Sequence, residues 1–391
     1  MILIAVLLFG ACIFLHELGH FLSAKACKIR VLEFSVGMGP RLFHFQRGET
    51  VYSIRALPVG GFCAFEGETG EEEDPEAEKA EADQPTLPAG EQLPEKRHWW
   101  QKEDTEPAPK PVYDEHSFCR QPFWKRLIVL VMGGVMNILF GMVLMGILLA
   151  PQDMFATTTI SKFVENSPMQ QAGIQVGDRL TSIDGYKIRT DMDVSTALAM
   201  ANPDSVDIVV NRNGAEVAFP NVKLLSNVVD GRKVVQMDFY VQPEKRTPLT
   251  LIKKSVQNTY SVERMVLSTL KGLITGRFGL SDVSGPVGMA QAITQTASAG
   301  LHHSFATAVS NIVYVIMIIT VNLGIVNLLP VPGLDGGKIL FIIIEVIRRK
   351  PISAKHQAVI EAGFMAALVG FMVLVTISDV MRLATGTGLG G

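Results

Sequence analysis

The sequence predicts a multi-pass α-helical membrane protein with about four spans, a small membrane-associated β element and an inserted extracytoplasmic α/β domain. Hydrophobic residues make up 48% of the 391-residue chain and the mean hydropathy is +0.28, which is too apolar for a typical soluble enzyme. Long apolar runs are flanked by basic residues, as membrane spans are. Between these runs, shorter segments show the alternation that is typical of strands.

The first apolar run, residues 1–26, contains three ionisable residues, His16, Glu17 and His20. Residues four apart share one face of a helix, so both histidines can bind one metal ion with Glu17 beside it. A zinc ion held by three protein ligands lowers the pKa of its water from about 15.7 to about 7, and Glu17 could take that proton. Polar residues merely tolerated at a helix end are the weaker interpretation, because a charge near the bilayer centre costs at least ~2.5 kcal/mol.

Residues 31–66 contain short β-prone pieces separated by glycines and prolines, at 32–36, 42–45 and 51–54. These pieces are too short to span a membrane and could form a small sheet beside the metal site. Its exposed edge could bind an extended substrate as an added strand. A plain interfacial loop is an equally weighted alternative.

Residues 67–117 form an acidic, proline-rich segment. Seventeen acidic and only five basic residues lie between Glu66 and His116, so we expect a disordered cytoplasmic insertion without a chemical role. Basic residues elsewhere lie mainly beside apolar runs, and no nucleic-acid partner is indicated. The four cysteines show no CxxC spacing and predict no disulfide framework.

The second span, 123–150, contains Asn137, which must find a polar partner within the membrane. The following α/β domain, 155–243, contains a run from Ser167 to Gly185 that resembles the PDZ domains of bacterial envelope proteases. Such a domain would bind an extended peptide or tail outside the membrane. Residues 249–300 are amphipathic and predict one or two extracytoplasmic interfacial helices.

The third span and the motif after it occupy residues 305–337. Two prolines and three glycines break the helix at membrane depth, which is tolerated only where backbone lines a cavity or is buried. Asp335 in this break is the natural third zinc ligand. Asn327 could hold a substrate carbonyl group or cap the broken helix. A short cytoplasmic-side helix, 338–350, and a fourth span, 358–383, complete the chain.

The chain resembles intramembrane zinc metalloproteases of the site-2 protease family, most of all bacterial regulator of sigma-E proteases. The resemblance rests on the PDZ-like domain and on two separate motifs, His16-Glu17-x-x-His20 and Asn327-x-x-Pro-x-Pro-x-Leu-Asp335-Gly336. The resemblance implies that one zinc ion per chain is bound by His16, His20 and Asp335, with Glu17 as the catalytic base. It also implies substrate-binding roles for Asn327 and for residues of the β element: Val51, Tyr52, Ser53, Ile54, Gly60 and Gly61.

The family resemblance further implies single-span membrane substrates, such as anti-sigma factors or remnant signal peptides. The chain departs from some relatives in having one PDZ-like domain and the acidic insertion. The positive-inside rule places the N-terminus and the PDZ-like domain outside a bacterial cytoplasmic membrane and the zinc site toward the cytoplasm, because Lys25, Lys28 and Arg30 follow the first span.

Two other functions are compatible with parts of the sequence: a non-proteolytic binding protein with a structural zinc, and a metal transporter. Glu17 argues against both, because neither a four-ligand structural site nor an ion path needs a neighbouring base.

Overall fold

The computed structural model describes residues 2–68, 113–229, 232–276, 285–350 and 352–385. Four of the described helices are long and apolar enough to cross a membrane: α1 (Ile2–Ala26), α3 (Phe123–Leu149), α8 (Phe305–Asn327) and α10 (Ala354–Thr385). They confirm the predicted multi-pass class. Most of the predicted acidic insertion, residues 69–112, lies outside the described residues.

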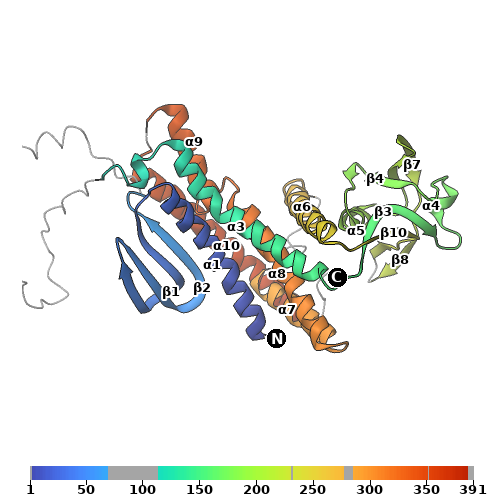
Figure 1. The fold of residues 1–391 in the computed structure, drawn as a ribbon, viewed down its shortest axis with the longest axis horizontal. Helices are drawn as coiled ribbons and strands as arrows, with labels where there is room; N and C mark the ends of the chain where they lie inside the picture. The colour runs from blue at the N-terminus through green and yellow to red at the C-terminus, as the bar shows by residue number, and fades with distance from the viewer. Residues whose placement is uncertain (1, 69–112, 230–231, 277–284, 351, 386–391) are drawn as a thin grey trace, which may run out of the picture.

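Helices α1, α3 and α8 pack side by side (Figure 1). Glycines allow this close approach. A Cβ atom on Gly19 of α1 would lie 2.4 Å from the carbonyl oxygen of Met132 in α3. Gly134 of α3 and Gly324 of α8 face each other, and a Cβ on either would lie 2.8 Å from the other's carbonyl oxygen. Small residues therefore set the packing of these membrane helices.

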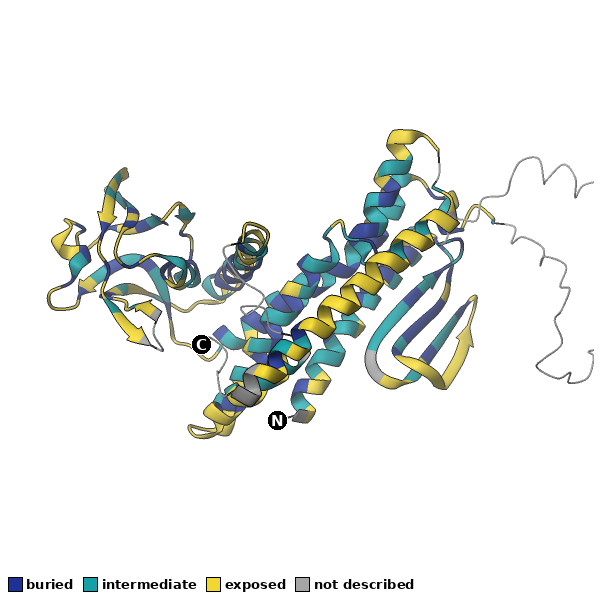
Figure 2. Ribbon diagram, turned by 180° about the vertical axis from the view of Figure 1, so that it is seen from behind, coloured by how far each residue is buried: buried dark blue, intermediate teal, exposed yellow. Residues whose placement is uncertain are grey.

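Helix α10 is mostly exposed along its length (Figure 2), and it packs against α7 (Pro286–Leu301). A helix that is apolar on all sides suits a lipid environment. Its polar anchor is Asp379, whose Oδ2 accepts hydrogen bonds from the backbone nitrogens of Gly285 (3.0 Å) and Gly288 (2.7 Å).

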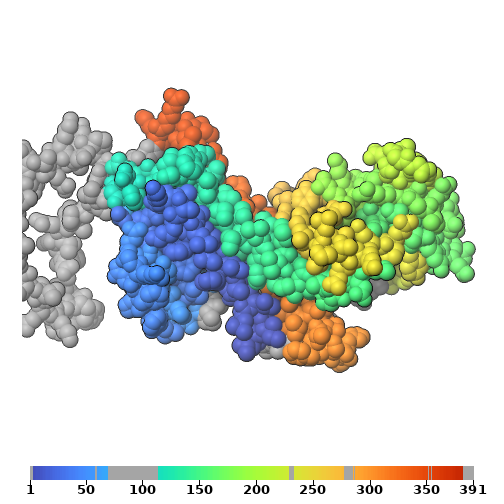
Figure 3. Space-filling model, in the orientation of Figure 1, coloured from blue at the N-terminus to red at the C-terminus, as the bar shows by residue number. Residues whose placement is uncertain are grey.

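The β element is an antiparallel pair, β1 (Val31–Arg47) and β2 (Thr50–Phe65), beside α1 (Figure 3). The predicted break into three short pieces was wrong. Gly37 and Gly39 have φ values of 87° and 85°, and the ladder continues past them through bulges. Residues 31–36 pair with 61–65 on one side and with 51–54 on the other, which makes 61–65 an edge strand within the described residues.

Arg30, at the base of β1, contacts both sides of the insertion. Its guanidinium bonds Glu66 through Nη1 and Asp114 through Nη2, each at 2.6 Å, and Glu49 through Nε at 3.2 Å. The chain therefore leaves the described structure near Arg30 and returns beside the same side chain.

The inserted domain is built on a sheet with the strand order β10-β3-β4-β6-β7, in which β5 also pairs with β4. Ile160, Leu180 and Ile208 are among its fully buried core residues. The elements of this domain are β3 (Met154–Phe163), α4 (Pro168–Gln171), β4 (Arg179–Ile183), β5 (Tyr186–Lys187), α5 (Asp191–Met200), β6 (Val206–Arg212), β7 (Ala215–Val222), β8 (Ser226–Val229), β9 (Arg232–Val235) and β10 (Phe239–Lys245). The short 3-10 helix η1 (Phe118–Arg120) lies before α3, beside the β element.

Helix α6 (Pro248–Ile274) connects this domain to the membrane helices. On one side, Arg264 Nη1 lies 3.2 Å from Oδ1 of the buried Asp193 in α5, and Lys254 Nζ donates to the carbonyl oxygen of Ala156 at 2.6 Å. On the other side, α6 packs against α3 and α8. Helices α6 and α7 fall within the region predicted to contain amphipathic helices.

Candidate active site

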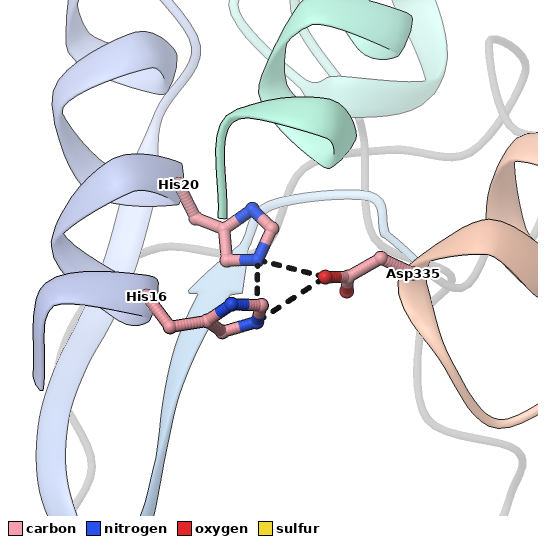
Figure 4. A group of neighbouring side chains, drawn as sticks. All are labelled: His16, His20 and Asp335. Atoms are coloured by element: carbon pink, nitrogen blue, oxygen red, sulfur yellow. Dashed lines mark hydrogen bonds and ion pairs between the residues drawn. The ribbon is translucent and has the colours of Figure 1, made fainter. Parts of the chain in front are cut away.

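Three side chains from two distant parts of the chain meet beside α3. His16 and His20 lie one turn apart in α1, and Asp335 begins α9 (Asp335–Arg348) (Figure 4). The Nε2 atoms of the two histidines are 3.3 Å apart. Oδ2 of Asp335 lies 3.2 Å from Nε2 of His16 and 3.1 Å from Nε2 of His20.

This spacing fits a zinc ion. Ligand atoms about 2.0–2.1 Å from a tetrahedral zinc lie about 3.3 Å from one another. Two neutral imidazoles and one carboxylate are ordinary zinc donors, and three protein ligands leave a fourth position open. The donor set is therefore that of a catalytic metal site rather than a closed structural one.

The chain between α8 and α9 positions Asp335 through close backbone packing. A Cβ on Gly336 would lie 2.0 Å from the carbonyl oxygen of Leu329, and one on Gly337 would lie 2.4 Å from that of Val331. Only glycine lets the first turn of α9 pack so tightly on the preceding loop. The predicted break of the helix thus fixes the carboxylate toward the two histidines.

Each histidine is also held through its other ring nitrogen. Nδ1 of His20 donates to the carbonyl oxygen of Val129 at 2.8 Å, which leaves the Nε2 lone pair for a metal. Nδ2 of the fully buried Asn137 lies 3.3 Å from Nδ1 of His16. The predicted polar partner of Asn137 is therefore a residue of the metal site. Gly133 of α3 packs directly against the imidazoles, since a Cβ there would lie 2.2 Å from Nε2 of His20.

Glu17 lies with the three metal-site residues around a pocket of about 210 Å³, next to the edge strand of the β element. Its Cγ atom would be 3.0 Å from a Cβ placed on Gly61. A carboxylate in this place is next to both the metal site and a strand edge that could hold a peptide.

The residues expected to bind substrate lie in different places. Nδ2 of Asn327 is 3.3 Å from Nε2 of His16, and Gly61 lines the pocket, with Gly60 directly before it. Val51–Ile54 pair on both sides, with 33–36 and with 43–46, so their strand is internal and they do not line the pocket.

Several pocket residues were not predicted. Glu68 and Lys338 line the pocket without having been expected there. Phe62, Cys63, Ala64 and Phe65 follow Gly61 along the edge strand; they belong to the β element expected to present substrate but were not named individually. Only Lys338 had a local signal, because it lies three residues after Asp335 and so on the same helix face. The others depend on the register of the β element, which the sequence pattern did not define.

A metal site of two histidines and one aspartate, with a glutamate beside it and among membrane-length helices, defines a membrane zinc metallopeptidase. Residues 4–371 match peptidase family M50, the site-2 protease family, and the chain belongs to that family.

The chain is 35% identical to a predicted zinc metalloprotease of Clostridium perfringens, and the match covers 97% of this chain and 98% of that protein. It is 29% identical to the regulator of sigma-W protease RasP of Bacillus subtilis, covering 97% of each. It is 30% identical to the zinc metalloprotease RasP of Bacillus licheniformis, covering 97% of this chain and 98% of the relative. The chain is a zinc metalloprotease.

Proposed function

We propose that the protein is an intramembrane endopeptidase that cleaves single-span membrane proteins, such as anti-sigma factors or remnant signal peptides, during regulated intramembrane proteolysis. The observation that carries this proposal is the convergence of His16, His20 and Asp335 among membrane-length helices. The name of the Bacillus subtilis relative, a regulator of sigma-W protease, supports the substrate class.

In this proposal His16, His20 and Asp335 hold one zinc ion per chain. The ion supplies Lewis acidity that polarises a carbonyl group and lowers the pKa of water. Glu17 accepts the proton of the attacking water as general base and delivers it to the leaving amide nitrogen as general acid. Val129 and Asn137 keep the two imidazoles in their ligating orientation.

The substrate would bind in extended form along the edge strand 61–65. This edge borders the pocket and has no strand partner on its pocket side within the described residues, so its backbone can pair with an added strand. Asn327 and Gly60 would contact the substrate near the scissile bond. Val51–Ile54 stay a prediction for substrate contact, and from an internal strand they could act only through their side chains.

The proposed orientation places the N-terminus and the inserted domain outside the cell and the zinc site toward the cytoplasm. Basic residues at two helix ends support it through the positive-inside rule: Lys25 in the last turn of α1 and Arg30 after it, and Arg348 to Lys350 at the end of α9. The inserted domain would bind an extended peptide or tail, as a PDZ domain does, and filter substrates. The lipid bilayer is the medium of the reaction.

A tagged single-span reporter, co-expressed in cells that lack related proteases, tests the proposal. Wild-type protein should cleave it, and Glu17→Gln at equal abundance should not. Glu361→Gln is the matched control, because this glutamate also lies in a membrane-length helix, where it accepts a hydrogen bond from Gln357. Equal cleavage by wild type and Glu17→Gln would reject the role of Glu17. No cleavage of several reporters by the wild type would reject intramembrane proteolysis.

A further inference from the structure

The pocket beside the metal site is lined by a lysine side chain that has no role in the reaction as proposed above. Among the described residues that line this pocket, Lys338 is the only lysine or arginine. It lies in α9, one turn after Asp335, so the rigid start of that helix fixes the positions of both residues.

The partner of Lys338 comes from the β element. Its Nζ is paired with Oε1 of Glu68, in the turn that follows the edge strand 61–65. Both side chains also line a second cavity of about 240 Å³, so the pair forms a wall between the two spaces. The Lys338 side chain is 34% exposed and that of Glu68 is 22% exposed. Because the pair is partly exposed, water can solvate Glu68 when the ammonium moves to another anion.

Peptide hydrolysis generates such an anion in this pocket. The water oxygen bonds to the carbonyl carbon, one water proton passes to Glu17 and then to the amide nitrogen, and the C–N bond breaks. The second water proton leaves the new carboxyl group for the released amine. Negative charge grows on the carbonyl oxygen and remains on the new C-terminal carboxylate. A positioned cation in a site of low dielectric constant stabilises this charge.

We propose that Lys338 is a further catalytic residue. It leaves Glu68 to bind the carbonyl oxygen of the scissile bond as charge develops there, and then binds the product carboxylate. This inference rests on the proposed function. The alternative is that the ion pair is purely structural and holds the turn at Glu68 against α9. The two roles differ in what they require of Glu68, because a structural ion pair needs both partners and a catalytic cation needs only the lysine.

Steady-state kinetics of the purified full-length protein in liposomes separate the two roles. Lys338→Met should lower kcat about 100-fold with little change in KM, and Lys338→Arg should recover part of the loss. Glu68→Gln should keep kcat within about threefold, because the ammonium remains. Arg126→Met is the matched control, since Arg126 lines only the second cavity and pairs with Glu345 of α9 at 3.1 Å. The zinc content should be equal in all variants.

Product binding gives a second readout. In the Glu17→Gln background, a peptide that ends in a free carboxylate at the cleavage position should bind more tightly than its C-terminal amide. Lys338→Met should abolish that preference, whereas Glu68→Gln should keep it.

Equal losses of kcat in Lys338→Met and Glu68→Gln, or full activity in Lys338→Met, would overturn the catalytic role and leave the proposed function intact. Absence of cleavage by the zinc-loaded wild type would overturn both.

Discussion

At the scale of single residues, the metal site depends on what surrounds each imidazole. His20 has one ring nitrogen toward Asp335 and the other on the carbonyl oxygen of Val129, so its ring has one orientation and one tautomer. Gly133 packs against both imidazole rings. The ligand geometry is thus set as much by α3, which contributes no ligand, as by α1.

Gly133→Ala should therefore disrupt the metal site. The added methyl group would lie 2.2 Å from Nε2 of His20 and 2.8 Å from Cε1 of His16, and no Cβ tolerates such contacts. We expect the affinity for zinc to fall at least about tenfold and reporter cleavage to be lost. Zinc titration of the purified protein measures the first effect. Gly10→Ala in α1 is the control, because its Cβ would have no atom within 4 Å. An unchanged zinc affinity in Gly133→Ala would contradict the packing described.

The convergence of His16, His20 and Asp335 could be predicted from the sequence, but the contacts that support these side chains could not. The spacing of His16 and His20 is local, and Asp335 stands in a helix break that needs a reason. Gly133 and Val129 contact the site only because α1 and α3 cross at that height. A crossing point between helices more than 100 residues apart is a tertiary property that no local pattern encodes.

At the scale of elements, glycines in the β element were wrongly interpreted as strand ends. Glycines were expected to end its strands, yet Gly37 and Gly39 allow bulges within a continuous strand. The bulged register makes 51–54 internal and 61–65 an edge. A small sheet with an exposed edge was among the expectations, but the sequence did not indicate which residues form that edge.

In the inserted domain, Asp178 is one of three almost fully buried carboxylates, together with Asp193 and Asp238. Arg212 donates to it through Nε at 2.8 Å and Nη2 at 2.6 Å, and the backbone nitrogen of Gln175 donates to it at 2.8 Å. The hydrogen bonds from Arg212 lower the pKa of Asp178 below its ordinary value. Asp178 therefore has a structural role here.

This arrangement predicts a pH dependence for the domain. Because the pKa of Asp178 is lowered on folding, its contribution to stability is complete above the unfolded-state pKa of about 3.9 and is lost as the pH falls through the lower folded value. Asp178→Ala should cost about 3 kcal/mol at neutral pH and remove the part of the acid dependence that Asp178 causes. Hydrogen exchange of the domain in the full-length protein, corrected for the intrinsic effect of pH, measures both.

The control is Asp204→Ala, which removes an exposed carboxylate paired with Lys233 and should leave exchange unchanged. Equal exchange in wild type and Asp178→Ala across the acid range would reject the structural role.

At the scale of the whole molecule, the structure combines two regions that pack in different ways. The membrane helices approach one another through glycines, whereas the inserted domain has a core of large apolar residues of its own. Helix α6 contacts both, with polar and charged side chains toward the domain and packing against α3 and α8 on the other side. Helix α3 thus contacts both α6 and the two histidines. The separate regions were predictable from composition, but this connection was not.

The contacts of Arg30 have a consequence for how the gene can change. Glu66 and Asp114, on either side of residues 69–112, are held by one guanidinium, so the catalytic unit needs no particular length of chain between them. Replacing 69–112 with a short Gly/Ser linker should leave the unfolding temperature, zinc content and reporter cleavage unchanged, whereas Arg30→Met should lower the unfolding temperature. A loss of zinc in the linker variant would contradict this. Insertions and deletions at this point can thus be neutral for catalysis, which leaves the segment open to evolve new roles while the chemistry stays the same.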